Sequence, residues 1–223
     1  MTPRFTRIAV AALLLAGTAA QAQTAGSLLV RGGATQIRPN VSSGDLSSPS
    51  FAGTKADIES ATQVSGGITM MLSDNVAIDL PLALPFKHDI VGAGAISGVG
   101  KIGEVKALPI TLLGQYRFFE PSMPFRPYLG GGLTYAKFFK AHSTATLSGL
   151  TGGTPANPTT LSVESKFALS LQVGASIALN ESWFVDASLV HTFLKTRTTL
   201  STGQTLDAKL DPNAISLGVG YKF

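Results

Sequence analysis

The sequence predicts an all-β protein: an eight-stranded antiparallel up-and-down transmembrane β-barrel with short periplasmic turns and long extracellular loops. Three observations predict this fold class. Apolar side chains recur at every second residue, the connections alternate between short and long, and aromatic residues gather at two levels. Only 13% of the residues are charged and the mean hydropathy is positive, which excludes a disordered chain. Because cysteine is absent, a disulfide scaffold, a thiol nucleophile and a cysteine metal site are excluded.

The N-terminus has the pattern of a secretory signal. Two arginines precede an apolar run from Ile8 to Ala16, and Ala20-Gln21-Ala22 provides small residues for cleavage. The alternative is a membrane anchor, which needs about 20 apolar residues. We therefore expect a cleaved signal peptide over residues 1–22 and an exported barrel domain over residues 23–223.

Period-two alternation defines the strands. In the last segment Ile215, Leu217, Val219, Tyr221 and Phe223 share one face, and Ser216, Gly218, Gly220 and Lys222 share the other. A strand that crosses a bilayer needs about 9–11 residues, and eight segments are long enough. The predicted strands are residues 27–38, 57–72, 76–86, 104–119, 126–140, 161–178, 183–200 and 205–223.

The connections alternate in length. Residues 73–75, 180–182 and 120–125 form short turns, and a further hairpin turns near residues 201–204. The other connections are long and rich in Gly, Ser, Thr, Pro and Asn: residues 39–56, 87–103 and 142–160. An even number of strands places both termini on the side of the short turns. A sheet in a bilayer must close on itself, because every backbone polar group needs an internal partner.

The aromatic residues separate a membrane barrel from a soluble barrel or sandwich, in which the apolar face would point inward. One group lies beside the short turns or the C-terminus: Tyr116, Phe118, Phe119, Phe125, Tyr128, Trp183, Phe184, Tyr221 and Phe223. A second group lies toward the long loops: Phe86, Tyr135, Phe138, Phe139, Phe167 and Phe193. Two such levels are typical of the aromatic girdles at the two membrane interfaces.

Several stretches, in order, resemble the OmpW family of small outer-membrane proteins. They are Leu84-Pro85-Phe86-Lys87-His88-Asp89-Ile90, Leu108-Pro109 with Gln115-Tyr116-x-Phe118, Arg126-Pro127-Tyr128-Leu129-Gly130-Gly131-Gly132, and Asp211-Pro212 before the last strand. The resemblance runs from about residue 27 to the end. It implies an eight-stranded barrel in the bacterial outer membrane, with a narrow hydrophobic channel linked to passive uptake of small apolar molecules. The middle of the long loops shows no family pattern, so the choice of ligand does not transfer.

The C-terminal residues also resemble the assembly signal of bacterial outer-membrane proteins. Tyr221 and Phe223 end a strand with aromatic or aliphatic residues at every second position. The partner that this resemblance implies is the barrel-assembly machinery. A last strand with a lipid-facing side would have the same pattern, and both interpretations can hold together.

Strand parity predicts which charged residues face the lumen. If the aliphatic faces meet lipid, five charged residues point inward in the periplasmic half: Arg31, Asp79, Arg117, Asp186 and Lys222. Eight strands leave an interior just wide enough for side chains to fill, and a buried charge without a partner is costly. We therefore hypothesise a polar plug. The alternative is a wet lumen in which these are ordinary polar residues.

The outer half of the predicted lumen is apolar. We expect a channel or vestibule for small hydrophobic solutes, lined by Leu80, Ala83, Leu84, Pro85, Phe86, His88, Val190 and Leu194. Pro81 and Pro85 lack an N–H and loosen the strand ladder locally. The functional interpretation is lateral escape into the membrane between weakened strands. Loose packing near the rim is the alternative.

Catalysis is disfavoured. The three histidines form no zinc motif, and His191-Thr192-Phe193 departs from the His-x-Ser arrangement expected of a lipid A deacylase. No cofactor and no metal are expected. The expected partners are outer-membrane lipids, lipopolysaccharide and small hydrophobic solutes; the low net charge of +4 disfavours nucleic acid. The rival functions are a structural or adhesive filled barrel without transport, and a lipid-modifying enzyme.

Overall fold

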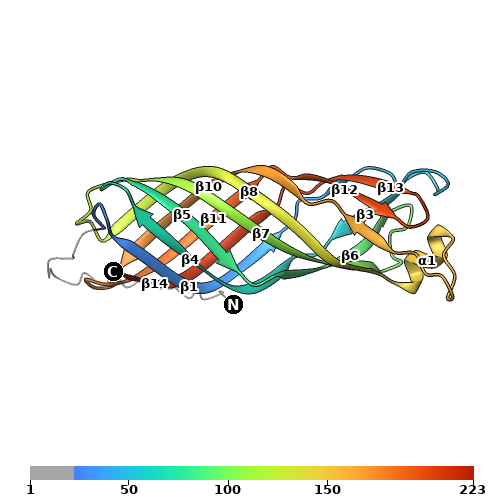
Figure 1. The fold of residues 1–223 in the computed structure, drawn as a ribbon, viewed down its shortest axis with the longest axis horizontal. Coiled ribbons are helices and arrows are strands. Elements are labelled where there is room, and N and C mark those ends of the chain that lie inside the picture. The colour runs from blue at the N-terminus through green and yellow to red at the C-terminus, as the bar shows by residue number, and fades with distance from the viewer. Residues whose placement is uncertain (1–22) are drawn as a thin grey trace, which may run out of the picture.

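The computed structural model describes residues 23–223, so the predicted signal peptide lies outside the described residues. These residues form a long barrel with a smaller sheet and one short helix at one end (Figure 1). The elements are β1 (Leu28–Arg38), β2 (Ser42–Ser43), β3 (Thr54–Ile58), β4 (Ala61–Met71), β5 (Val76–Ala83), β6 (Phe86–Gly94), β7 (Lys101–Arg117), β8 (Phe125–Ser143), α1 (Ala145–Thr151), β9 (Leu161–Val163), β10 (Lys166–Ala178), β11 (Trp183–Thr192), β12 (Lys195–Leu200), β13 (Thr205–Lys209) and β14 (Asn213–Lys222).

The barrel is a closed, eight-stranded antiparallel ring, as the alternation predicts. Around the ring β1 pairs with β4, β4 with β5, and β5 and its continuation β6 with β7. Then β7 pairs with β8, β8 with β10, β10 with β11, and β11 with β14. The pairing of β14 with β1 closes the ring. Both described chain ends lie with the short turns, at the periplasmic end (Figure 1).

Alternation along the strands sorts side chains into two environments. On β10 Leu169, Leu171 and Val173 are exposed on the outside, whereas Ser170 and Gln172 are buried inside. The other barrel strands follow the same pattern, so an apolar belt surrounds a polar interior. This is the pattern of a barrel that meets lipid, and it is the reverse of a soluble barrel. Among residues 23–223 no helix is both long and apolar enough to cross a bilayer.

Several predicted strands divide or run on beyond their expected ends. Residues 57–72 contain the end of β3 and all of β4, and residues 76–86 break at Leu84 and Pro85. β6 then continues to Gly94, inside a segment predicted as a loop. Beyond the barrel β2, β13, β12 and β9 form a second, four-stranded sheet at the extracellular end. Only β2 of this sheet lies in a predicted long loop, whereas β9, β12 and β13 lie inside the predicted strands 161–178, 183–200 and 205–223, which divide at their extracellular ends.

The two aromatic levels exist, but not every member faces outward. Tyr116, Phe119, Phe125 and Trp183 are exposed near the periplasmic end, and Phe167 and Phe193 are exposed toward the other. Four other members of the two predicted groups turn away from lipid. Tyr128 and Phe184 are buried in the lumen, and Phe86 and Phe138 line interior cavities. The girdle prediction was wrong for these four residues, because strand parity places them on the inner face.

The interior contains three apolar clusters along the barrel axis. Leu29, Met71, Ala77 and Phe184 pack at the periplasmic end. A middle cluster contains Ala136, Ala168, Leu194 and Leu210. The extracellular sheet and α1 enclose the third, which contains Ile96, Ile102, Leu147, Leu161 and Leu200. The polar residues of the lumen lie between the first and second clusters, and this is where the candidate site begins.

Candidate functional site

Arg31 reaches from β1 into the lumen and binds two carboxylates. Its Nη1 and Nη2 donate to Oδ1 and Oδ2 of Asp79 on β5 at 2.7 and 2.9 Å. Its Nε lies 3.7 Å from Oδ1 of Asp186 on β11. Thr69, on the strand between β1 and β5, accepts from Nη1 and donates to Asp79. A bidentate pair with further hydrogen bonds can offset the desolvation of its charges.

Arg117 forms a second group on the periplasmic side of this pair. The fully buried side chain donates to Gln115, Ser176 and Gln23. Its Cζ lies 4.6 Å from the ring centroid of Tyr128, a cation–π geometry. The hydroxyl of Tyr128 donates to both carboxylate oxygens of Asp186, at 3.0 and 3.1 Å. Tyr128 therefore links the Arg117 group to the Arg31 group.

Arg126 and an apolar layer complete the closure of the periplasmic end. Arg126 donates to the backbone carbonyls of Gln23 and Asp74, which ties the start of the described chain to the first short turn. The cluster that contains Leu29 and Phe184 fills the remaining width. We call the three arginines, the two aspartates, Tyr128 and this cluster the floor. The floor fills the bore with hydrogen-bonded charged groups and packed side chains.

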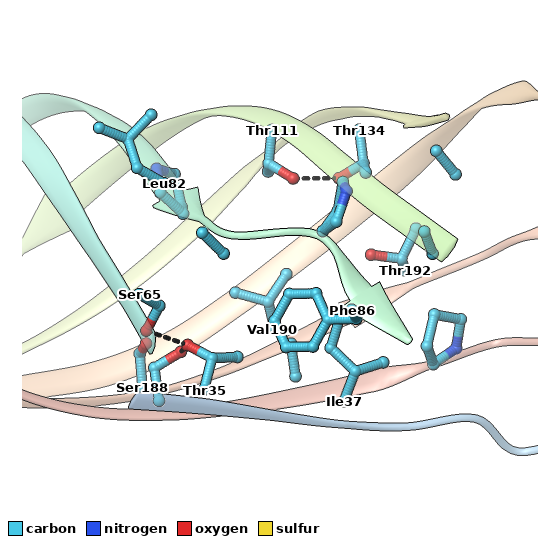
Figure 2. Close-up of a pocket in the computed structure, with 18 of the residues that line it drawn as sticks. Thr35, Ile37, Ser65, Leu82, Phe86, Thr111, Thr134, Ser188, Val190 and Thr192 are labelled. Atoms are coloured by element: carbon cyan, nitrogen blue, oxygen red, sulfur yellow. Dashed lines mark hydrogen bonds between the residues drawn. The ribbon is translucent and has the colours of Figure 1, made fainter. Parts of the chain in front are cut away.

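A cavity of about 130 Å³ lies directly above the floor. Its lower wall includes Arg31, Gln172 and Asp186, and its upper wall includes Val105 and Phe138. Between them the wall carries hydroxyl groups, which Figure 2 shows on opposite sides of the space. They belong to Thr35, Ser65, Thr111, Thr134, Ser188, Thr192 and Ser216. The cavity is therefore charged but ion-paired at the bottom, hydroxyl-lined in the middle and apolar at the top.

A second cavity of about 80 Å³ lies in the extracellular part. Its lining is mostly aliphatic and includes Leu46, Ile96 and Leu161. Four residues line both cavities and form the boundary between them: Ile58, Val105, Phe138 and Leu210. An apolar solute from outside would thus cross the upper cavity and the apolar boundary before it reached the hydroxyl groups of the lower cavity.

The barrel wall beside the lower cavity is interrupted. Pairing of β5 with β7 stops at Asp79 and Leu113, and pairing of β6 with β7 resumes only at Phe86 and Ala107. Residues 80–85 and 108–112 therefore face each other without ladder hydrogen bonds, and we call this stretch the wall break. Its prolines cannot donate a backbone hydrogen bond; they are Pro81, Pro85 and Pro109.

Leu82, in the wall break, is accessible both from the lipid-facing surface and from the lower cavity. It is 46% exposed on the outer surface, and it also lines the cavity (Figure 2). Ala83 and Pro109 line the cavity beside it, whereas Leu84 and Ile110 are exposed on the outside. At this place the cavity and the lipid-facing surface are separated by single side chains rather than by a bonded sheet.

The structure brings together most of the residues predicted for the vestibule. Ala83, Phe86, His88, Val190 and Leu194 line the lower cavity. His88 Nδ1 lies 2.8 Å from the backbone oxygen of Glu59.

Three predicted vestibule residues do not line the lower cavity. Leu84 is 57% exposed on the outside, and Leu80, four residues earlier, shares its face. Pro85 belongs to the wall break instead. The prediction was wrong for Leu80 and Leu84, since their parity is that of the lipid-facing side.

Four of the five residues predicted for the plug belong to the floor: Arg31, Asp79, Arg117 and Asp186. Lys222 does not join the Arg31 group. It is partly exposed and lies two positions nearer the periplasmic end than Gly220, the partner of Arg31 on β14.

The sequence prediction missed Tyr128, Arg126 and Gln172, although parity puts all three on the inner face. Gln172 is 3.4 Å from Asp79 and 2.7 Å from Gln115. Strand parity predicts whether a side chain points into the lumen, but it does not predict which residue that side chain contacts across the lumen.

The other chemistry-bearing residues lie apart from the cavity floor. His191 Nδ1 is 2.9 Å from Asn213 Oδ1, and its ring packs edge-on against Phe193 at the outer aromatic level. His142 is exposed near the extracellular end. Among residues 23–223, no three His, Asp or Glu side chains are grouped so that they could hold a metal ion.

The comparison with known proteins agrees with this geometry. The model of the OmpW family matches residues 24–223. Outer membrane protein W of Vibrio cholerae is 33% identical over 89% of each chain. A dibenzothiophene metabolism operon protein, PahQ of Pseudomonas aeruginosa, is 25% identical over 77% of this chain and 76% of its own. The crystal structure of OprG from Pseudomonas aeruginosa superposes with a TM-score of 0.80 at 28% identity, covering 91% of this chain and 98% of that one.

Proposed function

Since the chain belongs to the OmpW family of bacterial outer-membrane β-barrels, we propose that it is a passive conduit for small hydrophobic molecules. In this proposal a solute moves from outside through the upper cavity into the lower one and leaves sideways through the wall break. The observation that carries the proposal is the position of the wall break, directly beside a cavity that is closed below.

The energetics favour a sideways exit over passage along the axis. Movement through the floor would separate Arg31 from Asp79 and expose buried charges, and breaking one buried ion pair costs about 3–5 kcal/mol. Movement through the wall break separates strands that share no ladder hydrogen bonds there. An apolar solute gains a hydrocarbon environment on leaving, so the route needs no external energy.

The name of one relative supports an apolar cargo. PahQ is named for the metabolism of dibenzothiophene, a fused aromatic molecule without charge. The wall of the lower cavity around Phe86 and Val190 suits such a molecule, because apolar surface transfers favourably from water to an apolar lining.

The decisive experiment closes the wall break. Continuing the register from Asp79 and Leu113 places Leu82 opposite Ile110, and both are exposed on the outer surface. The variant Leu82→Cys/Ile110→Cys, linked by a short bis-maleimide, bridges the break. Because the chain contains no cysteine, the link is unique. The readout is the rate at which N-phenylnaphthylamine fluorescence rises in intact cells that express the protein.

We expect the link to abolish the protein-dependent rate and the unlinked variant to retain it. The control pair is Val185→Cys/Val219→Cys, which lies opposite in register on the bonded strands β11 and β14. Linking this pair should leave the rate unchanged. An undiminished rate in the linked Leu82/Ile110 variant would overturn the sideways exit, and a rate equal to that of cells without the protein in every variant would favour a structural barrel.

A further inference from the structure

The hydroxyl groups of the lower cavity form two hydrogen-bonded chains. One runs from Thr111 on β7 through Thr134 and Ser170 to Thr192 on β11, with oxygen–oxygen distances of 2.8, 2.6 and 2.9 Å. The other joins Ser65 and Ser216 to Thr35 at 2.7 and 2.6 Å. The chains lie on opposite sides of the cavity (Figure 2). A purely hydrocarbon solute could not form a hydrogen bond with either chain.

Each chain retains hydrogen-bonding capacity after its internal bonds are made. A hydroxyl group donates once and accepts twice. Four hydroxyls joined by three bonds, as in the Thr111 chain, leave one O–H donor and several lone pairs. Three hydroxyls joined by two bonds, as in the Thr35 chain, also leave one donor. These groups can therefore bind a further donor or acceptor that occupies the cavity.

The charges below the chains do not favour an ionised ligand. Asp79 and Asp186 both lie against the Arg31 guanidinium, which is bound by two parallel hydrogen bonds to Asp79. A carboxylate ligand would compete with Asp79 for donors already in use, and an ammonium ligand would meet Arg31 itself. Across the cavity from Thr111 and Thr134, Phe86 and Val190 offer apolar surface (Figure 2), and Val105 and Phe138 do so at the boundary with the upper cavity.

We propose that the preferred solute of this conduit is a small amphiphile with a neutral hydrogen-bonding head, such as an alcohol, whose head group binds at Thr111 and Thr134 and whose hydrocarbon chain points toward Phe138 and the upper cavity. This inference rests on the proposed function and specifies its cargo. A cavity of about 130 Å³ is close in size to the roughly 150 Å³ cavity that holds one benzene molecule in an engineered protein. The lower cavity therefore takes a head and about six carbons, and a longer chain continues past Val105 and Phe138 into the upper cavity.

Thr111 also lies where a departing solute must pass. It belongs to residues 108–112, which form one side of the wall break. The head group consequently binds beside the exit, and its hydrogen bonds are the last that the solute exchanges before it reaches lipid.

The test compares 1-hexanol with hexane on the full barrel domain in lipid nanodiscs. The readout is the NMR shift of the Val190 methyl groups, which face the cavity. The methyl groups of Leu189, which lie on the outside of the same strand, report solute that has merely dissolved in the bilayer. We expect 1-hexanol to saturate the Val190 shift at a concentration 2- to 10-fold lower than hexane, as one net hydrogen bond would give.

The double variant Thr111→Val/Thr134→Val removes a hydrogen-bonded hydroxyl pair at nearly constant volume. It should abolish the advantage of 1-hexanol over hexane, because hexane makes no hydrogen bond that the change removes. Thr111→Ser/Thr134→Ser should restore the advantage, and Thr199→Val, on exposed β12, should have no effect. A heat-dependent gel shift verifies that each variant forms the closed barrel.

The possible failures are distinguishable. Equal binding of hexane and 1-hexanol in the unmodified protein overturns the amphiphile inference and leaves the conduit intact, even if the valine variant does not fold. If neither solute saturates the Val190 shift, the cavity takes no cargo and the proposed function fails as well.

Discussion

Arg31 and Asp79 lie 48 positions apart in the sequence, on strands that do not touch, and share two parallel hydrogen bonds across the barrel interior. The contact passes in front of β4 and has room because Gly67 has no side chain. A Cβ on Gly67 would lie 2.6 Å from Cζ of Arg31. One ion pair therefore fixes the relative positions of three strands.

Loss of the Asp79 charge should weaken the barrel strongly. Asp79→Asn leaves the Arg31 guanidinium with Asp186 alone, at 3.7 Å, and a broken buried pair costs about 3–5 kcal/mol. Urea unfolding in lipid vesicles, followed by the fluorescence of Trp183, measures the change. The control Asp207→Asn breaks the exposed pair with Arg197 and should leave the free energy of unfolding almost unchanged, because solvent screens exposed ion pairs. Equal effects of the two changes would contradict a structural role for the floor.

A methyl group at Gly220 should disturb the periplasmic end. A Cβ there would lie 2.2 Å from the ring of buried Phe184, so the ring or the strand must move. Overpacking of this kind costs about 1–3 kcal/mol. The same unfolding measurement should show no comparable loss for Gly32→Ala, because nothing lies within 4 Å of a Cβ at Gly32.

Narrowing the cavity should slow uptake without unfolding the barrel. Val190→Phe adds a ring inside the lower cavity, whereas Leu189→Phe adds one on the lipid side of the same strand. We expect the N-phenylnaphthylamine rate to fall several-fold for the first variant and to stay unchanged for the second. A similar rate for both would mean that the solute does not occupy the cavity.

Glu104, in the extracellular part of β7, should keep its negative charge well below pH 4.5. Hydrogen bonds from Lys101 and Lys87 lower the pKa of Glu104 from 4.5 to about 2. A lowered carboxyl pKa adds stability that is fully present above pH 4.5 and is lost as the pH falls through 2. NMR titration of the Glu104 side chain checks this value. In Lys87→Ala/Lys101→Ala the pKa should return toward 4.5, and an unchanged value would rule out the lysines as its cause.

The eight barrel strands could be predicted because each must satisfy lipid on one side and the lumen on the other. Polar and apolar side chains therefore alternate along each strand, as buried Ser170 and exposed Leu171 illustrate. Pro81 and Pro85 similarly predicted the wall break, because proline lacks a backbone N–H and this is known from the sequence alone. Pro109 on the opposite strand contributes to the same break and was not singled out, because strand adjacency is a property of the closed ring.

The extension of β6 beyond the membrane belt and the partners within the floor could not be predicted. Residues 87–94 lack alternation because β6 leaves the membrane belt and pairs through its backbone with β3 and β7. The contact of Tyr128 with Asp186 depends on the diameter and stagger of the barrel, which bring β8 and β11 face to face across β10. The roles of Phe223 in assembly and of lipopolysaccharide as a partner stay predictions.

The joining of β1 to β14 has a consequence for how the molecule forms. The earliest and latest strands of the domain are neighbours, so the ring cannot seal while any of the chain is still missing. Until then the N–H and C=O groups at the edges of β1 and of the last strand formed are unpaired, and other polypeptides can hydrogen-bond to them. A chain that ends before residue 213 lacks β14, the strand that closes the ring. Premature termination should therefore yield aggregates rather than smaller barrels.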